Sequence, residues 1–205
     1  MSNDRPQIYL ITPPQIDIGT FPETLARLLD AEAVACLRLD LATRDEDRLM
    51  RAADALRAVT EPRDVALVIR DQWAIAERTG LDGVHLSDGV RNVRAARKAL
   101  GTDAIVGSFA GTSRHEGMNA GEAGVDYVTF GPCGGAISAE DALAQDELFA
   151  WWSEVIEIPV VAEGGLNEER LATLSKITDF VSFGEEVWSD DDPLARLSGL
   201  SARLG

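Results

Sequence analysis

The sequence is poor in the residues that build disulfide frameworks and metal centres. Its 205 residues include two cysteines, Cys36 and Cys133, and two histidines. The cysteines lie far apart without metal-type spacing, so they are most simply free thiols in a reducing compartment. A histidine-rich metal site is excluded, and a cytoplasmic location is expected.

Long hydrophobic runs and excess positive charge are also missing. No apolar run approaches the roughly 20 residues needed to cross a bilayer. The polar start, Met1 to Gln7, lacks the apolar core of a signal peptide. A net charge of −16 repels nucleic acid and anionic membranes. These features predict a small-molecule partner, with neither nucleic acid nor membrane, and they leave a homo-oligomer open.

What the sequence does contain is an unbroken alternation of short apolar runs and amphipathic stretches. Strands are predicted over 7–12, 33–41, 64–70, 83–87, 104–110, 126–131, 160–162 and 178–184. Helices are predicted over 21–31, 45–59, 72–79, 92–100, 113–123, 142–157, 168–174 and 193–204, with Asn167 as an N-cap.

Eight strand–helix units without a linker predict parallel strands joined by helical crossovers. We therefore expect an α/β protein with a single (β/α)8 TIM-barrel domain over residues 1–205. A doubly wound open sheet is the alternative. It usually carries a glycine-rich first turn, whereas the first turn here is Pro13-Pro14.

In such barrels the active site lies at the carboxyl ends of the strands, and the last two loops often bind phosphate. Glycines follow both of the last two strands, and glycine lets bare N–H groups approach a ligand. The predicted phosphate-binding residues are Gly164, Gly165, Ser182, Phe183 and Gly184. The alternative for Gly164-Gly165 is a plain tight turn.

Two aspartates at strand ends could hold a hard cation. Asp71 and Asp88 suit Mg²⁺, which takes few carboxylates and leaves other positions to water and substrate phosphate. Asp71 could instead cap the following helix, and Asp88 could be a turn residue before Gly89. The small-molecule partner would then be a phosphate substrate.

Three further residues lie close to the predicted site. Arg38, on a buried strand, needs an anionic partner, which is either Asp40 or a ligand. His85 lies inside a strand, as a core histidine or as a substrate-binding group. Cys133, beside two glycines, is exposed enough to react in principle, although no basic neighbour activates it. Trp151 and Trp152 are expected to pack outside the barrel.

Four motifs carry a resemblance to a known family. They are Cys36-Leu-Arg-Leu-Asp40, Asp82-Gly-Val-His-Leu86, Ala123-Gly-Val-Asp-Tyr-Val128 with Phe130-Gly-Pro132, and Pro159-Val-Val-Ala-Glu-Gly-Gly165. Over about residues 7 to 190 the chain resembles the thiamine-phosphate synthases and the related thiazole tautomerases.

The resemblance implies an enzyme of thiamine biosynthesis. Such a synthase joins a thiazole phosphate to a pyrimidine diphosphate and releases pyrophosphate, which Mg²⁺ and basic residues stabilise. It implies catalytic roles for Arg38 and Asp71, and a binding role for His85.

The chain departs from the family pattern at the strand ends. Asp40 stands where the family has a lysine, Arg70 where it has an asparagine, and Val90 where it has an aspartate. Phe109 replaces a serine, with Ser108 on the other face, while Pro132 replaces the tautomerase histidine and Glu163 an apolar residue. The Cys133–Ser138 loop has no lysine. One lost contact of this kind can lower a rate by about 10²–10³.

Three hypotheses result. The first is a synthase that the lost lysines would weaken. The second is an inactive barrel that binds a phosphate ligand or regulates. The third is a barrel enzyme of other chemistry that uses the acidic mouth.

Overall fold

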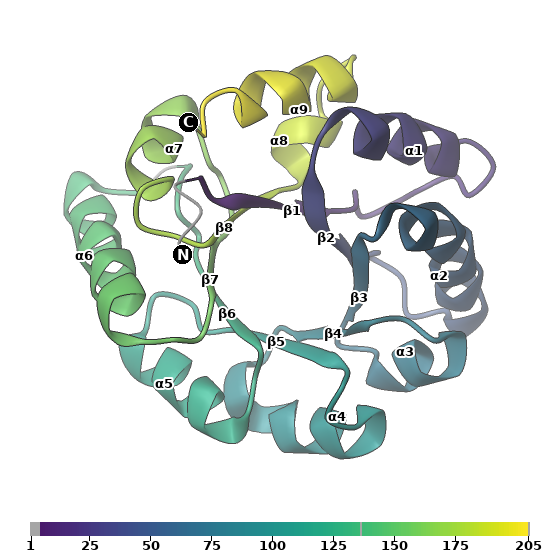
Figure 1. The fold of residues 1–205 in the computed structure, drawn as a ribbon, viewed down its shortest axis with the longest axis horizontal. Helices are drawn as coiled ribbons and strands as arrows, with labels where there is room; N and C mark the ends of the chain where they lie inside the picture. The colour runs from purple at the N-terminus through teal and green to yellow at the C-terminus, as the bar shows by residue number, and fades with distance from the viewer. Residues whose placement is uncertain (1–4, 136, 205) are drawn as a thin grey trace.

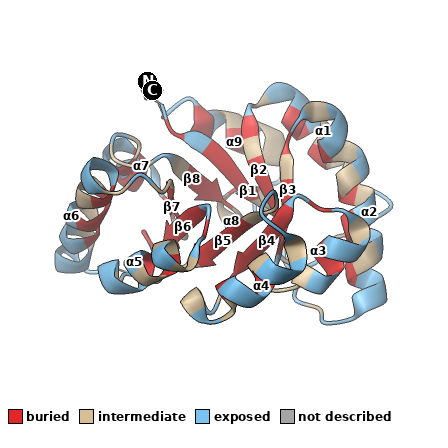
Figure 2. Cartoon of the chain, turned by 60° about the horizontal axis from the view of Figure 1, so that its bottom comes forward, coloured by how far each residue is buried: buried red, intermediate tan, exposed pale blue. Residues whose placement is uncertain are grey.

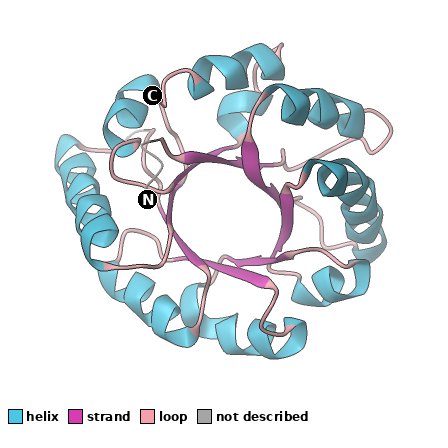
Figure 3. Cartoon of the chain, in the orientation of Figure 1, coloured by secondary structure: helices cyan, strands magenta, loops and turns pink. Residues whose placement is uncertain are grey.

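The computed structural model describes residues 5–135 and 137–204, in which eight parallel strands close into a barrel in chain order. Figures 1 and 3 show the ring of strands with the helices around it. The strands are β1 Gln7–Ile11, β2 Val34–Leu39, β3 Ala66–Arg70, β4 Gly83–Leu86, β5 Ile105–Phe109, β6 Tyr127–Phe130, β7 Val160–Ala162 and β8 Phe180–Phe183. The prediction of a TIM barrel is confirmed, and the open sheet is excluded because β1 pairs with β8.

The helices form the outer layer, with exposed outer faces and buried inner ones (Figure 2). They are α1 Phe21–Ala31, α2 Glu46–Thr60, α3 Trp73–Thr79, α4 Val93–Leu100, α5 Arg114–Ala123, α6 Ala139–Val155, α7 Glu168–Leu174, α8 Glu185–Trp188 and α9 Pro193–Ser201, with 3₁₀ turns η1 Glu61–Arg63 and η2 Gly89–Asn92. Within the described ranges, none of these helices has the length and apolar character that a bilayer span requires.

Helix starts follow local side-chain chemistry. The predicted cap is confirmed at Asn167, whose side chain accepts a hydrogen bond from the Arg170 amide at 2.9 Å. Ser138 caps α6 in the same way through the Asp141 amide at 3.0 Å, so this helix begins three residues before the predicted start. The short helix α8 was not predicted, because four residues show no helical period.

The strands bury both of their faces. On the outer face, Trp152 of α6 is fully buried, with its ring centre 5.0 Å from that of Phe130 on β6, which confirms the packing role predicted for it. On the inner face, the hydroxyls of Tyr9 on β1 and Tyr127 on β6 meet across the barrel at 2.8 Å. The barrel is therefore a filled core, open to ligands only at its ends.

Strand register assigns each side chain to a face. A Cβ on Gly107 would lie 2.0 Å from Cζ of Tyr127, so Gly107 faces the interior and must be glycine. Side chains alternate along a strand, so the neighbouring Ser108 faces the helices. This agrees with the prediction that Ser108 lies on the other face from the family's serine.

Candidate active site

An arginine and a glutamate from opposite sides of the barrel meet in its interior. Arg38 of β2 donates from Nη1 to Oε2 of Glu163 at 2.9 Å and from Nη2 to Oε1 at 2.6 Å. Such a two-pronged pair is the strong form of the arginine–carboxylate bond. The Arg38 side chain is only 5% exposed. Burial acts to lower the pKa of Arg38, but the interactions with Glu163, Tyr9 and Asp40 outweigh it and raise the pKa well above the usual value.

The ion pairs continue from Arg38 towards the mouth of the barrel. Nε of Arg38 lies 3.1 Å from Oδ2 of Asp40, whose other oxygen accepts from Nη1 of Arg70 at 3.1 Å. Nε of Arg70 lies 3.4 Å from Oδ2 of Asp71. Arg38 is thus held by two carboxylates, although only Asp40 had been predicted as its partner inside the protein. Arg70 is half exposed, so it is the cation in this series of ion pairs that solvent reaches.

Asp71 has a strained backbone and a fixed carboxylate. Its φ is +59°, a left-handed conformation that is uncommon outside glycine. Its two oxygens accept from the amide of Ser87 at 2.7 Å and from the Ser87 hydroxyl at 2.6 Å. The alternative that Asp71 caps α3 is wrong, because Gln72 occupies that position and makes no side-chain cap.

The second predicted metal ligand, Asp88, is the residue before η2 and accepts from Asn92 at 2.6 Å. Across residues 5–135 and 137–204, no group of three or more histidine, cysteine, aspartate or glutamate side chains could hold a metal ion. The described residues therefore form no cage built by protein alone, and a Mg²⁺ ion held by Asp71 and Asp88 stays a prediction.

His85 is a buried, neutral group. It is 2% exposed, and its Nδ1 lies 3.0 Å from the Tyr127 hydroxyl. Burial lowers the pKa of His85 well below the usual value, and the positive charges of Arg38 and Arg70 lower it further. This is the geometry of the core-histidine alternative, and substrate binding by His85 stays a prediction.

The last two strand ends present converging backbone amides. Gly164 and Gly165 have φ values of +87° and +70°, so both need the freedom of glycine. The amides of Gly165, Leu166 and Gly184 lie 2.7, 3.2 and 2.9 Å from the carboxylate oxygens of Glu186. We call these three amides the anion cup. Phosphate binding there stays a prediction, but the amides do converge on one anion.

A cleft of about 470 Å³ opens beside the anion cup. It is lined by residues 11–14 after β1, by Glu163, Gly164 and Gly165 after β7, and by Ser182, Gly184–Glu186, Trp188 and Ser189 at β8 and α8. Ser182 is 1% exposed, and its hydroxyl has no hydrogen-bond partner in the described part of the chain. The side chain of the other predicted residue, Phe183, is fully buried in the core, so only its backbone could meet a ligand.

The loop after β6 corrects one expectation. Cys133 is fully buried rather than exposed, and its amide donates to the carbonyls of Glu163 and Gly164, both at 2.9 Å. Nε of the buried Arg170 donates to its carbonyl at 2.8 Å. Burial raises the pKa of the Cys133 thiol to about 12, so the thiol is inert at neutral pH. Residue 136 of the Cys133–Ser138 loop lies outside the described residues, as do residues 1–4 and 205 of the predicted domain.

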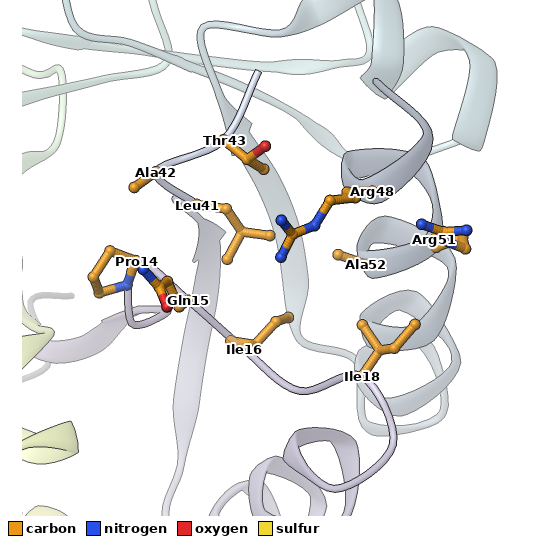
Figure 4. Close-up of a pocket in the computed structure, with 10 residues that line it drawn as sticks. All are labelled: Pro14, Gln15, Ile16, Ile18, Leu41, Ala42, Thr43, Arg48, Arg51 and Ala52. Atoms are coloured by element: carbon orange, nitrogen blue, oxygen red, sulfur yellow. The ribbon is translucent and has the colours of Figure 1, made fainter. Parts of the chain in front are cut away.

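Figure 4 shows a separate pocket of about 300 Å³, between the loop after β1 and helix α2. Arg48 reaches from α2 towards Leu41 in it. It contains none of the predicted site residues, and its two arginines are Arg48 and Arg51.

The structure therefore joins the predicted residues into two groups. One is the ion-pair chain of Arg38 and Asp71 with Glu163, Asp40 and Arg70, and the other is the anion cup with Ser182. Sequence reasoning missed Glu186 completely, because nothing in Glu185-Glu186 distinguishes it from a solvated helix start. From the sequence, Arg70 was noted only as a residue that replaces the family's asparagine, and it was given no role in the site.

A closed parallel barrel with polar side chains at its carboxyl rim belongs to the TIM-barrel class, in which the last two loops often bind phosphate. The family described as "Thiamine monophosphate synthase" matches residues 8–183. The chain belongs to this family, as the four motifs had predicted.

Among the curated relatives, the thiamine-phosphate synthase of Rhodospirillum centenum is 41% identical over 187 residues, which is 89% of each chain. That of Erythrobacter litoralis is 38% identical over 196 residues, 92% of this chain and 91% of the relative. Among solved structures, the thiamine phosphate pyrophosphorylase of Pyrococcus furiosus superposes with a TM-score of 0.79 at 20% identity, covering 98% of both chains. This last likeness shows the shared fold.

Proposed function

We propose that the chain is a thiamine-phosphate synthase, which joins a thiazole phosphate to a pyrimidine diphosphate and releases pyrophosphate. Family membership and the names of its relatives support this activity. The observation that carries it is the anion cup, because three amides of the last two strand ends converge on one anion. That is the position at which barrels of this kind bind phosphate.

In this proposal the two groups of residues receive the two substrates. The anion cup and Ser182 bind the phosphate of the thiazole. Arg70, at the other side of the mouth, binds and orients the diphosphate end of the pyrimidine, and Asp71 would act on that end through a Mg²⁺ ion. Arg70 is suited to this role because its guanidinium is half exposed and can donate to phosphate oxygens.

Magnesium would be held by Asp71 and Asp88 together with the diphosphate. When bound, Mg²⁺ neutralises negative charge on the departing pyrophosphate. The strained φ of +59° at Asp71 and its two bonds from Ser87 fix this carboxylate before substrate arrives. Fixed groups need little reorganisation when charge develops in the transition state.

Arg38 acts in this scheme as a positioning residue. Its guanidinium is taken up by Glu163 and Asp40 and lies below the open mouth. It holds Asp40, which in turn holds Arg70 by its Nη1 at 3.1 Å. This series of ion pairs gives Arg38 a role although Asp40 replaces the family's lysine two residues later. We place the reaction in the cytoplasm, in line with two cysteines that are buried free thiols.

The test is an assay of purified protein with the thiazole phosphate, the pyrimidine diphosphate and Mg²⁺. We expect formation of thiamine phosphate and an equal amount of pyrophosphate. Asp71→Asn should lower kcat/KM by about 10²-fold, because asparagine tolerates the left-handed backbone but removes the charge.

Asp54→Asn, the same change on the exposed face of α2, is the control and should leave kcat/KM unchanged. No product from the unaltered protein would refute the proposed activity. An equal loss in both variants would refute the role of Asp71.

A further inference from the structure

The anion cup is occupied by a side chain of the protein itself. Oε1 of Glu186 accepts from the amides of Gly165 and Leu166 at 2.7 and 3.2 Å, and Oε2 accepts from the amide of Gly184 at 2.9 Å. Both oxygens of one carboxylate therefore serve amides from two different strand ends. A carboxylate in this position stands where the oxygens of a bound phosphate would stand.

The cup keeps its shape without this carboxylate. A Cβ on Gly165 would lie 2.7 Å from the carbonyl carbon of Gly134, so the turn is wedged against the loop after β6. That loop is bonded in turn to the carbonyls of Glu163 and Gly164 through the Cys133 amide. The direction of the Gly165 amide is thus set by backbone packing rather than by Glu186.

Helix α8 is also anchored independently of the Glu186 carboxylate. Val187 is fully buried, and Nε1 of Trp188 donates to the carbonyl of Ile11 at 2.6 Å. Arg196 donates to the carbonyl of Glu186, which is backbone, at 3.1 Å. The side chain of Glu186 can consequently rotate out of the cup while the helix stays in place.

One polar group beside the cup is left unsatisfied by Glu186. The hydroxyl of Ser182 is buried, the residue lines the adjoining cleft of about 470 Å³, and among the described residues the hydroxyl has no partner. Buried hydroxyls normally find a partner. The carboxylate of Glu186 does not bond to this hydroxyl, and a phosphate monoester brings one more terminal oxygen than a carboxylate does. The unpartnered hydroxyl is therefore a candidate contact for a phosphate that enters the cleft.

We propose that Glu186 is a specificity-determining residue that holds the anion cup in the free protein and must be displaced by the phosphate of the substrate. The identity of that substrate rests on the proposed function, whereas the competition itself does not. The apparent dissociation constant for phosphate is raised by the inverse of the fraction of molecules whose cup is free. Neutral ligands cannot replace the carboxylate and are rejected.

The test compares Glu186→Ala and Glu186→Gln with Glu185→Gln, which removes the same charge one residue away. Binding of inorganic phosphate and of the thiazole phosphate is measured by calorimetry. Loss of the competing carboxylate should tighten both by about tenfold or more in the Glu186 variants. The Glu185 variant should stay within about twofold of the unaltered protein, because only general charge repulsion changes there.

Amide NMR signals of Gly165 and Gly184 report on the cup directly. In the unaltered protein, saturating phosphate should move both signals, because the acceptor changes from carboxylate to phosphate. Binding that is no tighter in the Glu186 variants, or signals that do not move on phosphate binding, would overturn the proposal. Equal tightening by Glu185→Gln would overturn it as well, since the effect would then be one of net charge.

Thermal unfolding shows whether the Glu186 variants are still folded and gives a second measure of phosphate binding. Glu186→Ala should gain more in Tm from added phosphate than the unaltered protein does, since a ligand that binds only the folded state stabilises it in proportion to its affinity. An inactive protein whose Glu186 variants bind phosphate more tightly would refute the synthase but retain this inference. An active protein with unchanged phosphate affinity in these variants would support the synthase and refute this inference.

Discussion

Two carboxylates of this protein lie on groups that could otherwise bind an anion, and they differ in how the fold surrounds them. Glu163 binds the guanidinium of Arg38 inside the barrel, where Arg38 is 5% exposed and Glu163 is 18% exposed. Glu186 binds backbone amides at the rim, beside an open cleft. The first contact joins two charges that water hardly reaches, and the second joins a charge to neutral groups that water can hydrate.

This difference separates a structural ion pair from an exchangeable one. Removing one member of a buried pair leaves a charge that has neither water nor a partner. Removing Glu186 leaves amides that a ligand or water can satisfy. The acidic mouth that sequence reasoning took as a loss of function therefore contains two kinds of acid, and in our proposal only the one at the rim competes with a substrate.

The contrast is largest in stability. Glu163→Ala should lower the free energy of unfolding by about 3 kcal/mol, because Asp40 alone then faces the buried Arg38. Glu186→Ala should cost less than about 1 kcal/mol. Urea denaturation measures both, with Glu61→Ala, which breaks the exposed pair with Arg57, as a control near zero. Equal costs at Glu163 and Glu186 would erase the distinction.

A substitution that disturbs the backbone of the rim should also separate the two regions. Gly165→Ala combines a φ of +70° with a Cβ only 2.7 Å from the Gly134 carbonyl carbon, so we expect a loss of about 2 kcal/mol and of phosphate binding. Gly111→Ala has a similar φ of +58° but meets no described atom within 4 Å. It should cost about 1 kcal/mol. If both variants lose the same stability in chemical denaturation, the close contact between Gly165 and Gly134 does not contribute to stability.

The buried interior should also respond to pH. Burial lowers the pKa of His85 in the folded protein below the 6.5 of the free side chain. Between these two values the unfolded chain binds more protons, so stability rises with pH there and is lost as the pH falls below 6.5.

Below that pH the loss should approach about 1.4 kcal/mol per pH unit. Denaturation at a series of pH values should show a shallower slope for His85→Gln than for the unaltered protein. The same change at the exposed His115 of α5 is the control. Parallel slopes for all three proteins would contradict the buried neutral histidine.

The smallest stability effect is expected at Ser182. Its hydroxyl has no partner within the described chain, so Ser182→Ala should change the unfolding free energy by less than about 0.5 kcal/mol. Phosphate affinity should fall about fivefold, the value of one lost hydrogen bond. Ser108→Ala removes an equally buried, equally unpartnered hydroxyl on the outer face of β5, as far as the described residues show. It should leave calorimetric phosphate binding unchanged, and a similar loss there would remove Ser182 from the site.

Much of the fold could be predicted from local pattern. Continuous apolar runs and stripes of helical period lie within the chain itself, and parallel strands joined by helices have few ways to close. The cap at Asn167 was predictable for the same reason, since its bond spans only three residues. The start of α6 and the existence of α8 were not, because short helical turns carry too little periodicity.

The candidate site was predictable by position but only in part by partner: Asp40 was predicted as a partner of Arg38, and Glu163 was not. Arg38 and Asp71 were placed at the strand ends correctly, yet Arg38 and Glu163 are 125 residues apart and meet only across the closed barrel. Cys133 was expected to be exposed because glycines follow it. It is buried because its side chain joins the hydrophobic core, and Arg170, 37 residues later, bonds to its carbonyl.

The order of strands and helices, and the edge of the sheet where polar residues gather, were determined by the sequence alone, because both follow from contacts between near neighbours along the chain. Which carboxylate neutralises which cation, and that Glu186 turns into the cup of Gly165 and Gly184, was decided only by the tertiary structure. Closure of the barrel brings distant strand ends within hydrogen-bonding distance, and charges pair with whatever partner that geometry places nearest.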